Sequence, residues 1–444
     1  MTVKKYSFFE EYGFIGEFFT KPNDNSDRFA GTLKHSPVEG LTLEYCISDD
    51  KSPQICDRLY GILNNGEKCT LVGPFDLQTG SRFMSRGPFI RTGVAAVRFA
   101  VFGVFINDTT SATYCDFTFN GMQEFIYPQG FKRKLRFETK PLISVSGTHW
   151  KIDVLNKATF SHVGSDLANL LHTSNEDALE EIRRSLTSLV SETPISDLIL
   201  RQNLEFFFRY SPSIAQTPEI LFDNVFKITS IFSILISSPT FPDEIRVKLG
   251  NEIGVSYPLL YTLHIDKRTI ELAKQEFNNY HLPLKWIELD MGSILGEWME
   301  IYNNYKTLSS IYLYETNTRT INQTYGNIIL YATMLEFINI EINKGAGDKY
   351  ETPIACYACP ELSQYIREFF RRYNDREVGV NISLLRNDIA HVGRPSRLIH
   401  KLELHDFVLI EMYLKLIVTS SLFSKLGIKQ SLLFAYQKRH ILTN

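Results

Sequence analysis

The apolar residues of this chain repeat with two different periods, and this change constrains the fold more than any other feature. Up to about residue 165 they alternate with polar residues, as in Gly31–His35 and Leu41–Tyr45, which is the period of a half-exposed strand. From about residue 290 they recur three and four positions apart, as in Ile294, Trp298 and Tyr302, which is helical spacing. The sequence therefore predicts an α+β chain, with a β-rich N-terminal domain followed by an all-α helical bundle.

Turn residues separate many short apolar segments in the N-terminal part. Asn64-Asn65-Gly66 is typical of a hairpin turn and separates the segments 58–63 and 68–72, which predicts two antiparallel strands. The segment 94–106 is rich in Val and Phe and predicts either a buried pair of strands or one long bent strand. Further strands are expected at 113–119, 134–138 and 149–154. Many short strands joined by turns indicate a sandwich or a barrel-like sheet.

The middle of the chain mixes both patterns. Acidic residues after Ser174 predict the start of a helix that continues over 178–190, and a second helix is expected over 219–237. Short strands are expected at 244–248 and 258–264. This segment therefore extends the N-terminal domain as a mixed α/β region.

The C-terminal part is predicted to be entirely helical. After the first helix, further helices are expected near 328–338, 362–373, 381–391, 405–424 and 430–439. A chain of 444 residues has room for about two or three domains. We assign residues 1–285 to the N-terminal domain and residues 290–444 to the helical domain.

Composition excludes several classes of protein. The net charge is only −3, so any contact with nucleic acid must come from a local basic patch. Six scattered cysteines fit a reducing compartment, and Cys356-x-x-Cys359 lacks the second ligand pair that a zinc site needs. The N-terminus does not resemble a signal peptide, and the apolar segment 225–237 is too short to cross a bilayer. We expect a cytoplasmic protein without membrane contact, cofactor or metal.

The segment Leu385–Arg394 carries the most informative chemistry. It predicts the end of a helix that contains Arg386 and places His391 in the last turn, with Gly393 as the C-cap. Arginine offers a fixed fork of donors that matches phosphate oxygens, and histidine exchanges its proton near neutral pH. The two side chains together suit the holding of a phosphate and the transfer of a proton beside it.

The spacing of Arg386 and His391 does not place them on one helix face. Five positions correspond to about 140° of rotation and roughly 7.5 Å of rise. Either the last turn tightens, or the site combines residues from two copies of the helix. A twofold dimer would bring two Arg and two His together, and symmetric dimers are the commonest oligomers.

This combination suits metal-free cleavage of RNA. A base removes the proton of the ribose 2′-hydroxyl, the oxygen attacks the phosphate, and an acid protonates the leaving 5′-oxygen while arginine stabilises the phosphoryl charge. The products are a 2′,3′-cyclic phosphate and a 5′-hydroxyl. An arginine and a histidine at this spacing also occur by chance at many helix ends, so the spacing alone leaves a purely structural role open.

A resemblance to known families connects these features. Arg386–His391 resembles the signature of the HEPN superfamily, in which four residues separate arginine from histidine. Gly296–Tyr302 and Met334–Phe337 resemble two helices of the ApeA-like HEPN domain. Tyr12–Phe19 and Phe29–Leu33, followed by Gly40–Leu43, resemble the β-rich ApeA N-terminal domain.

The resemblance implies an anti-phage abortive-infection protein whose HEPN domain cleaves tRNA, in the anticodon region, as a dimer or higher homo-oligomer. Arg386 would hold the scissile phosphate, and His391 would be the general acid or base. Asn387 and Asp388 would orient them, or form a solvated helix face. Glu336 would position Arg386 through a salt bridge, or cap a core helix.

Other basic residues could form an RNA groove. Arg367, Arg371 and Arg372 lie on the polar side of an amphipathic helix, and Arg394 and Arg397 follow the motif directly. A solvated surface is the alternative role for each of them.

A second function stays open at this stage. The helical domain could serve only for dimerisation, while the β-rich domain binds a phage-derived trigger. Such a sensor or adaptor has no need for both Arg386 and His391.

Overall fold

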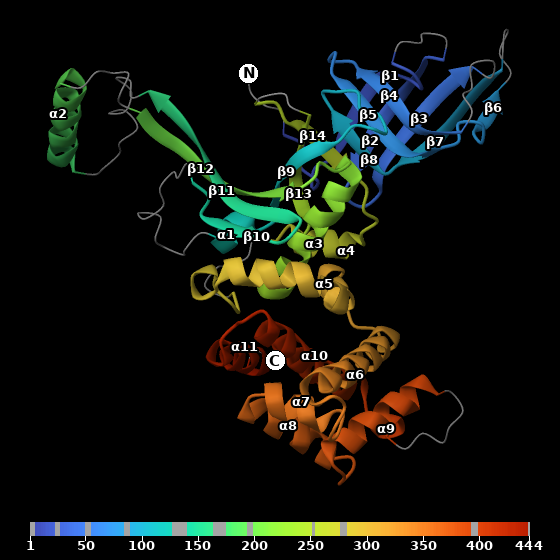
Figure 1. Ribbon diagram of the computed structural model, residues 1–444, viewed down its shortest axis with the longest axis vertical. Coiled ribbons are helices and arrows are strands. Elements are labelled where there is room, and N and C mark those ends of the chain that lie inside the picture. The colour runs from blue at the N-terminus through green and yellow to red at the C-terminus, as the bar shows by residue number, and fades with distance from the viewer. Residues whose placement is uncertain are drawn as a thin grey trace.

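The computed structural model describes residues 5–22, 27–48, 55–83, 89–126, 140–162, 175–192, 199–250, 254–275, 282–391 and 398–442. It has a β-rich N-terminal part and a helical C-terminal part, which lie at opposite ends of the long axis (Figure 1). The predicted fold class is confirmed.

Within the described residues, the strands form one antiparallel sheet of fourteen strands. Their order across the sheet is β10-β11-β12-β9-β13-β14-β8-β5-β4-β1-β2-β3-β7-β6. Their bounds are β1 Tyr12–Phe19, β2 Phe29–Ser36, β3 Gly40–Ser48, β4 Cys56–Leu63, β5 Lys68–Phe75, β6 Ser81–Phe83, β7 Ile90–Val97, β8 Phe99–Phe102, β9 Ala112–Phe119, β10 Ile143–Ser146, β11 Trp150–His162, β12 Ile199–Pro212, β13 Pro242–Leu249 and β14 Tyr257–Tyr261.

One end of the sheet curls into a barrel-like unit. The predicted hairpin is present, with Ile62 of β4 opposite Lys68 of β5 and Gly66 in the left-handed region at φ 78°. β5 and β7 are far apart in the strand order, yet they lie close together in this unit. A Cβ added to Gly73 of β5 would come within 3.2 Å of the carbonyl oxygen of Ala96 in β7. The inward side chains of this unit, Phe18, Leu33 and Leu71 among them, form a core of their own.

The other end of the sheet extends as a long hairpin. β11 and β12 pair from Trp150 opposite Pro212 to His162 opposite Ile199, whereas β9 pairs only with residues 208–210 of β12. Helix α2 (Glu176–Glu192) stands at the far end of this hairpin, away from the rest of the molecule (Figure 1). The sequence predicted α2 and the start of β11 but not β12.

Helix α3 (Pro218–Ile236) connects the sheet with the helical part. It packs on β9 and β13 and against α5 (Met291–Leu313), where Trp298 Nε1 donates a 2.8 Å hydrogen bond to the Lys227 carbonyl. The larger apolar core runs without interruption from the sheet through α3 into the helices. The two parts therefore share one core across the junction near residues 285–290.

The remaining helices are α1 Met122–Ile126, α4 Lys267–Ala273, α6 Ile321–Asn343, α7 Glu351–Tyr357, α8 Pro360–Arg371, α9 Val378–Ala390, α10 Leu404–Lys425 and α11 Gln430–Leu442. α10 is long and apolar enough to cross a membrane by composition, but 72% of that window is buried inside the protein. Its burial fits a core helix of the bundle.

Three predicted segments need comment. The segment 94–106 holds the end of β7 and all of β8, so of the two predicted alternatives two strands are present, and they pair with different neighbours rather than with each other. The strand expected at 258–264 ends at Tyr261. The strand expected at 134–138 lies outside the described residues.

Candidate active site on helices α6 and α9

Helix α9 positions the arginine and histidine of the predicted motif. Ile382 and Leu385 are buried against the bundle, and the buried Asn381 side chain donates to the Arg376 carbonyl (3.1 Å), which fixes the start of the helix. The helix ends at Ala390, and His391 is its C-cap at φ −118° and ψ 91°. The prediction that His391 lies in the last turn is thus wrong by one residue, because its extended backbone turns the chain out of the helix.

The His391 side chain is exposed, while its backbone N–H donates to the Asn387 carbonyl at 3.1 Å. The C-cap predicted at Gly393 is therefore wrong, since His391 takes that position, and Gly393 itself lies outside the described residues, as do Arg394 and Arg397. The imidazole therefore stands at the end of a fixed helix and is open to solvent.

Arg386 lies between α9 and α6. Its side chain is 32% exposed, and Nη1 is 4.0 Å from Glu336 Oε1, an ion pair without a hydrogen bond. Its Nε is buried and has no hydrogen-bond partner. Most of the donor capacity of this guanidinium is therefore not used within the protein, which is uncommon for a half-buried arginine.

Glu336 is held by two other residues that the sequence did not point to. Its Oε1 accepts 2.6 Å hydrogen bonds from Lys349 Nζ and from the Tyr350 hydroxyl. Burial acts to raise the pKa of Glu336, but these two hydrogen bonds and the charges of Lys349 and Arg386 lower it below its usual value. Glu336 therefore stays an anion and places two cations, Lys349 and Arg386, on one side of α6.

Asp388 holds the start of the described segment 398–442 against α9. Its Oδ2 accepts hydrogen bonds from the backbone N–H groups of Leu398 (2.9 Å) and Ile399 (3.3 Å). The backbone at residues 398 and 399 is thus held at α9, one turn before His391. The neighbouring Asn387 side chain is half-buried, and its carbonyl accepts the bond from His391.

Arg386 and His391 are not joined to each other. Across the described ranges, no hydrogen bond or ion pair links the two side chains, as five residues of helical separation would suggest. One copy of the chain therefore supplies the two groups at different positions at the end of α9, and within the described residues no hydrogen bond or ion pair joins their side chains.

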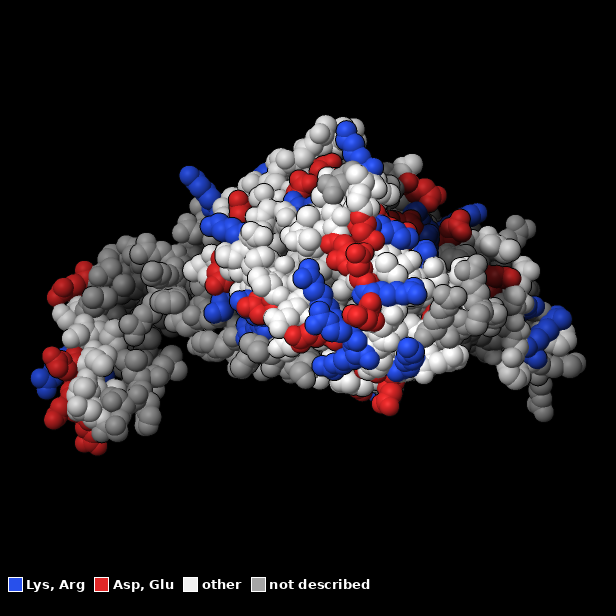
Figure 2. All heavy atoms as spheres, turned by 90° about the horizontal axis from the view of Figure 1, so that it is seen from below, with Lys and Arg blue, Asp and Glu red and all other residues white. Residues whose placement is uncertain are grey.

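The predicted RNA-binding arginines of α8 are all exposed. Arg367 and Arg371 lie on the helix, Arg372 is its C-cap, and the opposite face buries Leu362, Ile366 and two phenylalanines. The helical end of the molecule carries Lys and Arg interspersed with Asp and Glu, and several basic side chains gather near the lower middle of the view (Figure 2). Basic side chains on this face therefore form a local cluster and not a uniformly positive surface.

Cysteine and histidine do not gather into a metal site in the part of the chain that the structure describes. Cys356 is exposed, whereas Cys359 is buried and caps α8 by accepting from the Leu362 N–H at 3.5 Å. Its role here is in packing and capping.

Comparison with known proteins places the N-terminal part. The family model of ApeA N-terminal domain 1 matches residues 13–298, from β1 into the first turns of α5. The chain belongs to the ApeA family. The match supports a place in an anti-phage defence family, as the N-terminal segments predicted, and it stops before α6 and α9 of this ApeA-like chain. No curated protein and no solved structure matches.

Proposed function

We propose that this protein is a metal-independent RNA endonuclease of anti-phage defence, with Arg386 and His391 as its catalytic residues. The observation that carries the proposal is the end of α9, where an exposed histidine follows an arginine whose donors are largely unused. Anti-phage family membership gives such a site a purpose, because cleavage of host RNA halts the growth of an infected cell.

In the proposed mechanism, one side chain transfers protons and the others stabilise or position charge. His391 removes the 2′-hydroxyl proton or protonates the leaving 5′-oxygen, and Arg386 holds the phosphoryl oxygens. Glu336 keeps Arg386 oriented, and Lys349 adds a second positive charge nearby. Since DNA lacks the 2′-hydroxyl, this chemistry selects RNA.

A second copy of the chain completes the site in this proposal. Arg386 and His391 of one chain do not meet, and His391 is exposed at the surface of the bundle. Two α9 helices across a twofold axis would place the arginine of one copy near the histidine of the other. The substrate we propose is tRNA, cut in the anticodon region, where unpaired bases leave the backbone accessible.

The test is a cleavage assay on total tRNA in EDTA, with wild-type protein, His391→Ala and the control His405→Ala. His405 is an exposed histidine at the start of α10, so its loss tests for a general surface effect. We expect wild type and the control to yield 5′-hydroxyl ends and His391→Ala to yield none. Equal cleavage by all three would remove His391 from the chemistry, and no cleavage by any of them would favour a non-catalytic sensor that dimerises through the helices and binds a phage product.

A further inference from the structure

A second polar site lies where the N-terminal part meets the helices. A cavity of about 310 Å³ is lined by Ser237 at the end of α3, by the loop between α5 and α6, and by α10 and α11. Asn317 of that loop is exposed, so the cavity opens to solvent. Its size is within the range of small-molecule sites. It involves neither Arg386 nor His391.

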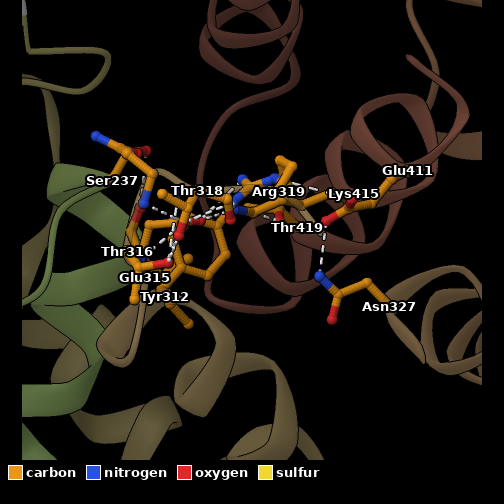
Figure 3. A network of polar contacts seen from close by, with 12 residues as sticks. Ser237, Tyr312, Glu315, Thr316, Thr318, Arg319, Asn327, Glu411, Lys415 and Thr419 are labelled. Atoms are coloured by element: carbon orange, nitrogen blue, oxygen red, sulfur yellow. Dashed lines mark hydrogen bonds and ion pairs between the residues drawn. The ribbon is translucent and has the colours of Figure 1, made fainter. Parts of the chain in front are cut away.

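Four charged side chains surround this cavity (Figure 3). Arg319 donates two hydrogen bonds to Glu315, from Nη1 to Oε1 (2.6 Å) and from Nη2 to Oε2 (3.0 Å). Glu315 Oε1 also accepts from the N–H groups of Thr316 and Asn317, which fixes the loop. This ion pair is fully engaged and forms the wall of the site.

The other two charged side chains are held less tightly: one oxygen of Glu411 has no hydrogen bond, and Lys415 lies beyond hydrogen-bond distance of Glu315. Glu411 is 3% exposed, and Asn327 Nδ2 bonds its Oε1 at 2.7 Å (Figure 3), but its buried Oε2 has no hydrogen-bond partner and lies 3.9 Å from Arg319 Nε. The Lys415 ammonium is 3.8 Å from Glu315 Oε2, beyond hydrogen-bond distance, and 4.1 Å from the centre of the Tyr312 ring.

Burial lowers the pKa of Lys415, although the negative charges of Glu315 and Glu411 oppose this effect. A buried carboxylate oxygen without a hydrogen bond, as at Glu411 Oε2, is costly, whereas the Lys415 side chain is 19% exposed. A ligand that donates to Glu411 and accepts from the neighbouring Lys415 would remove that cost.

The arrangement of these groups defines the chemistry of such a ligand. Glu411 and Lys415 are four residues apart on α10, so an acceptor and a donor lie next to each other on one helix face. The two positive and two negative side chains cancel, which disfavours a ligand with net charge. Tyr312, Met412 and Leu416 add aromatic and apolar surface to the lining.

We propose that this cavity binds a neutral heteroaromatic compound with a donor beside an acceptor on one edge, which is the chemistry of a nucleobase or nucleoside. The acceptor faces Lys415, the donor faces Glu411, and the ring packs on the apolar lining. Because Ser237 belongs to the N-terminal part and the other lining residues to the helical region, the ligand joins the two. The site is independent of the proposed nuclease chemistry.

The test measures binding to the full-length protein by isothermal titration calorimetry and thermal shift. The probes are the four common ribonucleosides, their monophosphates and a set of amino acids. We expect nucleosides to bind and to raise the melting temperature, as any ligand of the folded state does. Lys415→Met should weaken binding by about tenfold or more, because it removes a charged donor.

Two further variants make the result decisive. Lys425→Met removes a lysine from the same helix, outside the cavity, and should leave binding unchanged. Val408→Trp fills the cavity without removing a charge and should abolish binding, which decides the question if Lys415→Met does not fold. The proposal is overturned if no nucleoside binds, if both cavity variants bind normally, if monophosphates bind more tightly than nucleosides, or if only amino acids bind.

Discussion

Glu336 lies 4.0 Å from the Arg386 guanidinium, yet its hydrogen bonds come from Lys349 and Tyr350 at 2.6 Å. One oxygen of the carboxylate, Oε1, thus accepts from a cation and a phenol and attracts the arginine at a longer distance. This arrangement lets Arg386 turn toward a phosphate without the loss of a hydrogen bond.

The first prediction concerns this carboxylate. Glu336→Gln keeps the shape of the side chain but removes its charge, so Arg386 loses its electrostatic restraint. We expect kcat for RNA cleavage to fall by about tenfold, with KM changed less, because the interaction matters most when charge develops on the phosphate.

Glu341→Gln is the matched control for that variant, since Glu341 lies on the same helix and pairs with Lys425. It should leave kcat unchanged. A loss of kcat in both variants would mean that α6 acts through its general stability and not through Arg386.

The second prediction tests whether two chains share a site. Arg386→Ala and His391→Ala are each expected to be inactive. If the arginine of one chain acts with the histidine of the other, each mixed dimer keeps one intact site of two. Since half of the dimers are mixed at random exchange, activity should return to about a quarter of wild type. The measurement is tRNA cleavage after the two variants are mixed and allowed to exchange; activity that stays absent would mean that each chain uses its own pair.

The third prediction concerns a buried amide in the helical part. Gln437 is fully buried and bonds to the Cys359 N–H (2.6 Å), the Tyr357 carbonyl (2.6 Å) and Ser420 Oγ (2.7 Å). Gln437→Ala leaves these groups without partners and should lower the free energy of unfolding by about 2–4 kcal/mol.

Urea denaturation of Gln437→Ala and of Gln430→Ala checks this. Gln430 is exposed at the start of the same helix, so its replacement should change the free energy by less than about 0.5 kcal/mol. Equal effects would show that the buried network contributes little.

The fourth prediction uses pH. Asp243 accepts hydrogen bonds from Ser7 Oγ (2.5 Å) and the Phe8 N–H (3.0 Å), but burial raises its pKa to about 6. Between that value and its ordinary pKa, the folded state binds a proton that the unfolded state does not. Stability from this group therefore rises as pH falls through about 6, and is lost above it.

Asp243→Asn has no such dependence and keeps an oxygen acceptor for both bonds. The free energy of unfolding of Asp243→Asn minus that of wild type should therefore be larger at pH 8 than at pH 5, by about 1–3 kcal/mol. Urea denaturation at the two pH values measures this difference, and an offset that does not change with pH would contradict the raised pKa.

The sequence predicted local features of the fold better than the pairing of distant segments. The turn at Asn64–Gly66 and the helix α3 follow from local residue preferences, and both are present. β12 was missed because the polar run Arg201–Asn203 breaks the alternation, and its long pairing with β11 is what stabilises it. The order of the fourteen strands depends on contacts that no local pattern encodes.

The same limit applies to the two sites. Arg386 and His391 could be named from one short motif, whereas Lys349 and Tyr350 reach Glu336 only because the turn before α7 folds back onto α6. Glu315 and Arg319, like Glu411 and Lys415, are four residues apart in the chain, which suggests each pair. That the two pairs face one cavity follows from the packing of α10 against the α5–α6 loop.

The strand order also has a consequence during synthesis on the ribosome. β8 pairs with β14, and β9 pairs with β13. β8 and β9 are synthesised first, so the edges that these partners cover stay unpaired until residues 242–261 have been translated. α9, with Arg386 and His391, is made later still. The order of translation thus lets the N-terminal sheet close before the nascent chain carries the residues proposed to cut RNA.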